Sequence, residues 1–178
     1  MIGNFLLIVF IIFVFFLIYV VTRKSKFKYE KSTFIKTTPD KIFPYISNFK
    51  YGLLWNSFDQ KDPNTQRTFI GNDAEVGSKM EFKGNTDAGS GYLQILSLTA
   101  NSEVQMRLVM TKPIPADNLI VYKLNSESDG TKFTWSMSGD GGFIGQLVNV
   151  FIDCEKMIVD EFDKSFDSLK RLVEEKSE

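Results

Sequence analysis

The chain has 178 residues, of which 43% are hydrophobic and 24% are charged, a length that favours one domain with a short appendage. It contains no histidine and one cysteine, which excludes His-based acid/base catalysis, His-containing metal sites and an internal disulfide. Residues 1–22 carry no charged side chain, residues 23–31 carry five basic and one acidic, and the remaining 147 carry 16 basic and 21 acidic. An acidic domain without a basic stripe indicates that nucleic acid is not the partner.

The first predicted element is an apolar helix. Residues 5–21 read FLLIVFIIFVFFLIYVV, 17 consecutive apolar residues. A helix over residues 2–22 is about 31 Å long, which matches a hydrocarbon core of roughly 30 Å. A cleaved signal peptide fits less well, because no basic residue precedes the segment and no small-x-small site follows it. We therefore predict a retained transmembrane anchor over residues 1–22 and a single-pass membrane protein.

Residues 23–31 form a basic juxtamembrane segment that runs into the first predicted strand. Positive charges follow the apolar span and none precedes it, which predicts that the C-terminal domain faces the cytoplasm. Two roles fit the first four cations of this segment, Arg23, Lys24, Lys26 and Lys28. They either contact anionic lipid headgroups or act only as the topology signal.

The remaining residues, 27–178, are predicted to form one α+β domain. It begins with a strand over residues 27–36 and a short helix that starts at Thr38 and Pro39, an N-cap residue followed by a first-turn proline. A second short helix and a loop occupy residues 51–63. Alternation of apolar and polar side chains then predicts five strands, over residues 78–83, 92–99, 103–110, 118–124 and 131–138. No helix separates them, which predicts an antiparallel meander.

The chain closes with one long predicted helix over residues 143–174. Apolar residues recur there at three- and four-residue steps, and charged residues occupy the opposite face, as in an amphipathic helix. Such a helix is about 48 Å long, so its apolar stripe needs a wide, curved sheet to cover it. We predict that the antiparallel sheet supplies this cover.

Motifs that resemble catalytic or binding signatures are better explained by local structure. The glycine-rich stretch 139–145 lacks the third glycine of a dinucleotide fingerprint and a Walker lysine, so we interpret it as a strand-to-helix turn. Asp59 and Asp62 are interpreted as solvated turn residues rather than an acid/base pair, and Cys154 as a buried structural thiol. Alternation places no ionisable group on the inner face of the sheet. We therefore predict no catalytic residue, no metal site and no cofactor.

Four stretches, taken in order, carry a resemblance to a known family. They are FIKTTPDKIFPYISNFKYGLLWNSF at 34–58, VGSKMEFKGN at 76–85, GTKFTWSMSGD at 130–140 and VNVFIDCEKMIVDEFDKSFDSLKRLVEE at 148–175. Over residues 27–176 the chain resembles the polyketide cyclase/dehydrase group of the START-like (SRPBCC, Bet v 1-like) superfamily. The resemblance implies a helix-grip fold, in which a curved antiparallel β-sheet wraps around a long C-terminal helix, here preceded by one N-terminal transmembrane helix. It also implies a hydrophobic cavity between sheet and helix, and no shared catalytic motif.

Large apolar side chains from adjacent strands and from the final helix are the candidates for the cavity wall. They either fill a solid core or line a ligand cavity. The candidate ligand-binding residues are Trp55, Met80, Phe82, Tyr92, Met106, Phe133, Trp135, Phe151 and Ile158. Our first hypothesis is a membrane-anchored module that binds a small hydrophobic or lipid-like ligand. The alternatives are a cyclase/dehydratase-type enzyme acting on a polyketide-like substrate, and an interaction domain whose cavity is vestigial.

Overall fold

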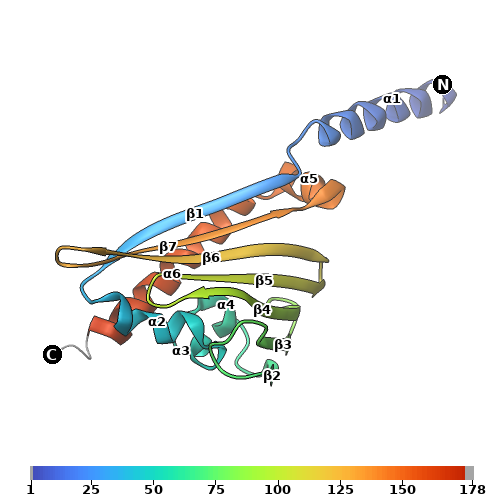
Figure 1. Cartoon of the computed structure of the whole chain (residues 1–178). Coiled ribbons are helices and arrows are strands. Elements are labelled where there is room, and N and C mark those ends of the chain that lie inside the picture. The colour runs from blue at the N-terminus through green and yellow to red at the C-terminus, as the bar shows by residue number, and fades with distance from the viewer. Residues whose placement is uncertain (1, 175–178) are drawn as a thin grey trace.

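The computed structural model describes residues 2–174 and has an α+β architecture (Figure 1). Seven strands form one antiparallel sheet, the long helix α6 packs against its concave face, and an apolar helix, α1, precedes the first strand. The elements in chain order are α1 (Ile2–Val21), β1 (Lys26–Ile35), α2 (Pro39–Ser47), η1 (Phe49–Tyr51), α3 (Gly52–Trp55), α4 (Ser57–Gln60), β2 (Gln66–Ile70), β3 (Lys79–Lys83), β4 (Ser90–Thr99), β5 (Glu103–Lys112), β6 (Ala116–Glu127), β7 (Gly130–Asp140), α5 (Gly142–Phe151) and α6 (Cys154–Glu174).

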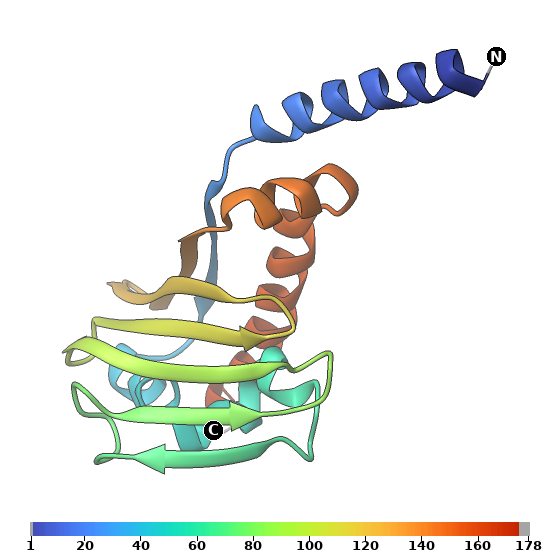
Figure 2. The ribbon, with the colours of Figure 1, turned by 90° about the vertical axis from the view of Figure 1, so that its right-hand side faces the viewer.

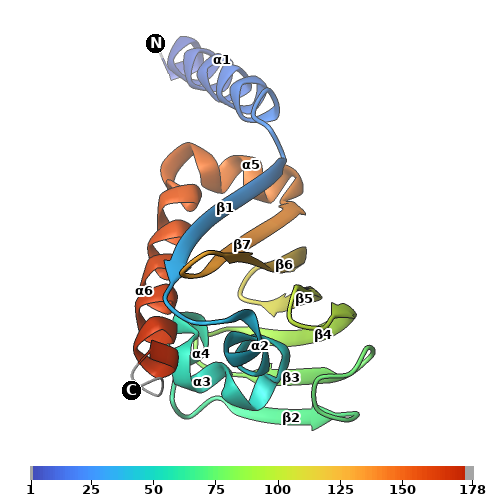
Figure 3. The ribbon, with the colours of Figure 1, turned by 60° about the vertical axis from the view of Figure 1, so that its left-hand side comes forward.

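The sheet is a meander to which the first strand is added at one edge. Its strand order is β1-β7-β6-β5-β4-β3-β2, and every neighbouring pair is antiparallel. β1 lies beside β7, with Lys26 opposite Asp140 and Ile35 opposite Thr131. The predicted antiparallel sheet is confirmed, and β2 is a further strand that the sequence pattern does not indicate. Figures 2 and 3 show α6 running along one side of the curved sheet.

The core lies between the concave face of the sheet and α6. The ring of Trp135 in β7 stacks on Phe162 of α6, with 4.3 Å between the ring centroids. Phe133 meets Phe166 of α6 edge-to-face at 5.3 Å, and Trp55 of α3 packs edge-to-face on Trp135 at 5.6 Å. All five side chains are at most 2% exposed. Burial of a large apolar side chain contributes about 1.5–3 kcal/mol, so this aromatic cluster holds α6 against the sheet.

The C-terminal helix is in fact two helices, which corrects the prediction of one continuous helix over residues 143–174. α5 ends at Phe151, and Ile152 has an extended backbone with φ −126° and ψ 130°. Asp153 explains the new start, because its Oδ1 accepts a hydrogen bond from the backbone N–H of Lys156 at 2.9 Å, as an N-cap side chain does. The apolar stripe continues across this break, so helical periodicity alone does not reveal it.

The glycine-rich stretch is a strand-to-helix turn, as predicted. β7 ends at Asp140 and α5 begins at Gly142. Gly142 has φ +53°, a left-handed conformation that glycine adopts at little cost. The Asp140 carboxylate accepts a hydrogen bond from the Gly142 N–H at 2.9 Å, which fixes the turn.

α1 projects away from the domain (Figure 1) and exposes nearly all of its apolar side chains. Within residues 2–174 it is the one helix that is long and apolar enough to cross a membrane. Near its end Val20 is buried, and Phe16 faces Phe151 of α5 with 6.2 Å between the ring centroids. The exposed surface shows that α1 is not a core helix of the domain.

Candidate functional site

A cavity of about 260 Å³ lies between the concave face of the sheet, α4 and the first half of α6. Its wall is mostly apolar because alternate residues of β4 to β7 point inward. The strand register sets Leu93 opposite Leu108 and Ile120 opposite Met137. The apolar and aromatic lining consists of Phe58, Phe82, Ala88, Leu93, Leu108, Met110, Ile120, Tyr122, Trp135, Met137, Met157 and Ile158.

Asp59 of α4 and Arg67 of β2 form a buried polar end of this cavity. Arg67 Nη2 lies 3.7 Å from Asp59 Oδ1, and the two side chains are 10% and 16% exposed. The same Nη2 donates a hydrogen bond to the Asp59 carbonyl at 2.8 Å, and Nη1 donates to the Thr65 carbonyl at 3.2 Å. Arg67 Nε has no hydrogen-bond partner among the described residues. The guanidinium therefore keeps one buried donor for another group.

Burial determines the protonation of Asp59. Loss of contact with water raises the pKa of its carboxyl to about 6, although the charge and hydrogen bond of Arg67 act to lower it. Asp59 can therefore exchange a proton close to neutral pH. This result corrects the prediction that Asp59 is a solvated turn residue. Arg67 of β2 corrects the prediction that the inner face of the sheet carries no ionisable group.

Asp62, the other member of the candidate carboxylate pair, braces the loops beside the cavity. Its Oδ2 accepts a hydrogen bond from the Asn85 N–H at 2.8 Å, and its Oδ1 accepts one from the Asn64 N–H at 2.9 Å. These two bonds lower the pKa of the Asp62 carboxyl, because they stabilise its charged form. The two aspartates thus differ in role: Asp62 joins the loop after α4 to the β3–β4 turn, whereas Asp59 lines the cavity.

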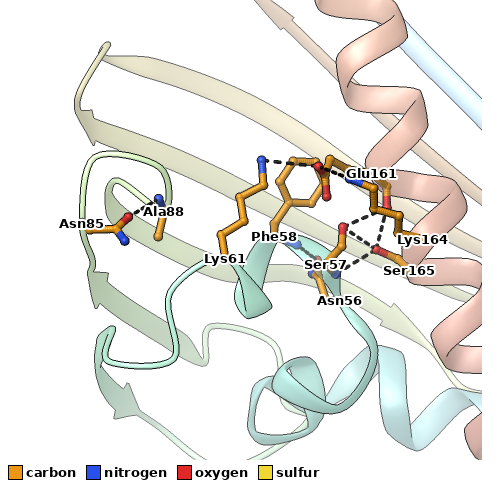
Figure 4. Close-up of polar contacts among 9 residues, drawn as sticks. All are labelled: Asn56, Ser57, Phe58, Lys61, Asn85, Ala88, Glu161, Lys164 and Ser165. Atoms are coloured by element: carbon orange, nitrogen blue, oxygen red, sulfur yellow. Dashed lines mark hydrogen bonds and ion pairs between the residues drawn. The ribbon is translucent and has the colours of Figure 1, made fainter.

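Short polar contacts fasten α4 to α6 and so position the ring of Phe58 (Figure 4). The backbone N–H of Ser57 donates to Ser165 Oγ at 2.9 Å, and Ser57 Oγ donates to the Glu161 carbonyl at 2.9 Å. Lys61 Nζ lies 3.7 Å from Glu161 Oε1, and both of these side chains line the cavity. The position of α4, and hence of Asp59, therefore depends on a contact between residues that are 108 positions apart in the chain.

Trp135 supplies a second buried donor without a partner. The residue is 1% exposed and lines the cavity. Within the described part of the chain its Nε1 makes no hydrogen bond. A buried donor left unpaired costs about 1–3 kcal/mol. An acceptor held in the cavity at Nε1 would remove that cost.

The predicted ligand-binding residues divide into three groups. The first group lines the cavity and consists of Phe82, Trp135 and Ile158. The second group is buried in the core instead of in the cavity wall and consists of Trp55, Met80, Met106 and Phe133. For this second group, the solid-core interpretation is the one that the packing favours.

Tyr92 and Phe151 form the third group and lie away from the cavity, which corrects their assignment to its wall. Strand alternation turns Leu93 inward and Tyr92 outward, where Lys79 Nζ lies 4.2 Å from the centroid of the Tyr92 ring. Phe151 is 74% exposed, because the helix break at Ile152 separates it from the face that packs on the sheet.

The sequence pattern identifies three of the lining residues and misses the others, among them Asp59, Arg67 and Met157. Arg67 reaches the cavity through the pairing of β2 with β3, which sets it opposite Phe82. β2 has no clear alternation in the sequence, so nothing local distinguishes Arg67 from other surface arginines. The sequence marks Asp59 as a candidate carboxylate, but only the packing of α4 decides that its carboxyl is buried.

Comparison with known proteins shows the fold of this chain, and it shows neither a family nor a function. No family model and no curated protein matches the sequence. Similar solved structures include the protein of unknown function SA2116 from Staphylococcus aureus, with TM-score 0.63 and 14% identity over 85% of this chain and 96% of that one. Protein CV1439 from Chromobacterium violaceum has TM-score 0.59 and 16% identity over 83% and 96%. The Aha1 dimer from Colwellia psychrerythraea has TM-score 0.60 and 18% identity over 83% and 96%.

Proposed function

We propose that the protein is a membrane-anchored binding module of the START-like, helix-grip type, which holds a small hydrophobic or lipid-like molecule between the sheet and α6. The observation that carries the proposal is a cavity with a mostly apolar wall and a buried polar end formed by Asp59 and Arg67. The ion pair of Lys61 and Glu161 also lines this cavity. Small-molecule sites typically combine a hydrophobic lining with a few fixed polar groups. The ligand that fits is amphipathic, with an apolar body and one polar group.

The unpartnered donors at the cavity indicate the chemistry of that polar group. Arg67 Nε and Trp135 Nε1 are both buried donors, so each is satisfied by an acceptor. A carboxylate, carbonyl or hydroxyl oxygen on the ligand meets this requirement. A pure hydrocarbon would leave both donors unpaired, at a cost of about 1–3 kcal/mol each.

α1 is the membrane anchor in this proposal, and the basic segment after it faces the cytoplasmic surface. The first four cations of this segment are all exposed, namely Arg23, Lys24, Lys26 and Lys28. Each cation close to an anionic lipid surface contributes about 1 kcal/mol, screened by salt. Contact with anionic headgroups would therefore hold the base of the domain against the bilayer.

Mass spectrometry of the molecules that co-purify with the full chain tests the binding function. Leu108→Trp introduces a large side chain into the cavity, and Val109→Trp adds the same side chain on the opposite face of β5 as the matched control. We expect one amphipathic species to be enriched with the wild type and with Val109→Trp, and to be lost from Leu108→Trp. Identical profiles for the three proteins, each shown to be folded by near-UV circular dichroism, would favour the interaction-domain alternative with a vestigial cavity.

One observation favours the enzymatic alternative, a cyclase/dehydratase acting on a polyketide-like substrate. The pKa of Asp59 is raised to about 6, a value that suits a general acid or base near neutral pH. Asp59→Asn keeps the size of the side chain and removes its proton transfer. If the protein is an enzyme, this variant should retain the co-purifying molecule and lose turnover of it; equal turnover by the variant would remove Asp59 from such a mechanism.

A further inference from the structure

α5 is an uncharged helix that leaves its large apolar side chains exposed. Its sequence, GFIGQLVNVF, contains no charged residue, and none of its residues is buried. Phe143, Ile144 and Phe151 are 48%, 53% and 74% exposed, and the next residue, Ile152, is 49% exposed. A contiguous apolar patch of this kind on a domain surface marks a site of interaction with a partner or a membrane.

This helix lies against the end of α1, the candidate membrane-spanning helix (Figures 1 and 3). The ring of Phe151 faces that of Phe16 at 6.2 Å. At the other end of the contact, Gln146 Nε2 donates hydrogen bonds to the carbonyls of Val21 and Arg23, at 3.4 and 2.5 Å. The two helices therefore run antiparallel. Phe151 therefore packs beside a residue of the apolar span, and a bilayer crossed by α1 would contact both rings.

We propose that α5 inserts into the membrane interface beside α1 and forms a second, non-spanning contact with the bilayer. The inference rests on the anchoring role of α1 in the proposed function. Phe16 precedes the end of α1 by five residues, which is about 7 to 8 Å along the helix axis. Interfacial helices bury their apolar face about 5 to 10 Å into the boundary between headgroups and acyl chains. Because α5 runs antiparallel to α1, its C-terminal end enters this boundary first, and Phe151 beside Phe16 lies at a comparable depth.

The charges next to α5 fit a position at a lipid surface. A groove between β1 and the α5–α6 junction is lined by three lysines and two carboxylates, namely Lys24, Lys26, Lys28, Asp153 and Glu155. Lys28 pairs with Glu30 at 2.8 Å, whereas Lys24 and Lys26 are exposed and, with Arg23 directly before them in the chain, form a basic surface. Anionic headgroups are attracted to a basic surface beside a membrane anchor. A bilayer would therefore contact the apolar patch with its acyl chains and the basic surface of the groove with its headgroups.

Insertion of α5 also brings the rim of the cavity to the membrane. Met157 lies in the first turn of α6, directly after the α5–α6 junction. It is 51% exposed and lines the cavity. A lipid-like ligand at this rim would exchange between the bilayer and the cavity without passing through bulk water. The apolar patch of α5 thus gives the tethered domain a fixed orientation and its cavity an entry from lipid.

Spin-label accessibility in the full chain tests this arrangement. The single cysteine is first removed by Cys154→Ser, and one new cysteine is placed in turn at Ile12, Leu54, Phe151 or Met157. These four side chains are all about half exposed or more. The labelled proteins are reconstituted into vesicles of phosphatidylcholine and phosphatidylglycerol, and collisions with oxygen, which concentrates in lipid, and with a water-soluble nickel complex are measured. Position 12 reports on the span, and position 54 is the matched apolar control away from α5.

We expect position 151 to resemble position 12, with nickel collisions several-fold fewer than at position 54 and frequent oxygen collisions. Position 157 should be shielded from nickel relative to position 54.

Nickel access at position 151 equal to that at position 54, with position 12 shielded, would overturn the role of α5 and leave the anchor intact. Nickel access at 157 equal to that at 54 would overturn the membrane-facing rim. Low access of both reagents at 151 would indicate a protein partner, such as a second copy, and overturn the proposal. Nickel access at 12 would overturn the anchor itself.

Discussion

Replacement of Asp59 by asparagine should stabilise the domain at neutral pH and change its pH dependence. Burial raises the pKa of Asp59 from an ordinary value of 3.8 to about 6 in the folded state. A displacement of that size corresponds to about 3 kcal/mol between the charged and neutral forms. Asparagine has the shape of a protonated carboxyl and no charge, so Asp59→Asn removes the cost of burying the carboxylate.

The sign of the effect follows from the state that binds the proton more tightly, which here is the folded state. Below about pH 4 the carboxyl is protonated in both states, so wild type and variant have similar free energies of unfolding. Between about pH 4 and pH 6 the unfolded chain releases its proton first, and the wild type loses stability relative to Asp59→Asn as pH rises. Above about pH 6 the difference levels off near 3 kcal/mol in favour of the variant.

Urea unfolding of the full chain in detergent micelles, followed by the fluorescence of Trp55 and Trp135, measures both free energies. Asp62→Asn is the matched control of opposite sign. Hydrogen bonds from Asn85 and Asn64 lower the pKa of the Asp62 carboxyl, so its charged form stabilises the fold. This control should be less stable than the wild type at pH 7, and its deficit should shrink as pH falls below about 4.

Parallel pH curves for the wild type and Asp59→Asn would refute the reasoning, because they would mean that folding leaves the pKa of Asp59 unchanged. A variant that is less stable than the wild type at pH 7 would show that the ion pair with Arg67 outweighs the cost of desolvation. In either case, burial in the cavity wall would not be the factor that controls the charge of the Asp59 carboxyl.

Four further predictions concern packing, folding and orientation. Trp135→Ala should lower the free energy of unfolding by about 3–5 kcal/mol, because the ring stacks in the aromatic core as well as lining the cavity; a loss below about 1 kcal/mol in urea titration would contradict that packing. Ser165→Ala should cost about 1–3 kcal/mol in the same assay, because it leaves the buried N–H of Ser57 without its acceptor. A fragment of residues 27–178 should be soluble and melt cooperatively by circular dichroism, whereas residues 27–142 should aggregate because α6 no longer covers the sheet; a soluble, cooperatively melting short fragment would disprove this. Protease added to intact cells should spare the C-terminal domain, and its digestion while a cytosolic marker survives would reverse the orientation.

Local patterns in the sequence determine most of the elements that this protein forms. The uninterrupted apolar run at residues 5–21 is sufficient to predict α1, because a helix satisfies its own backbone hydrogen bonds whatever surrounds it. Alternation predicts β3 to β7 because each strand has one face toward the core and one toward solvent. The apolar stripe from Ile158 to Leu172 predicts α6 and the face that it buries. Each of these inferences depends on residues that are close together in the chain.

Only the tertiary structure decides which elements meet and which side chains lose water. β1 pairs with β7 about 100 residues later, and the cap at Asp153 divides a stripe that is continuous in the sequence. Asp59 becomes a cavity residue because Ser57 is fastened to α6 and because β2 brings in Arg67. Its pKa follows from that burial, and desolvation is set by every atom packed around a group rather than by its neighbours in sequence. The polar end of the cavity and the exposed face of α5 therefore exist only in the folded molecule.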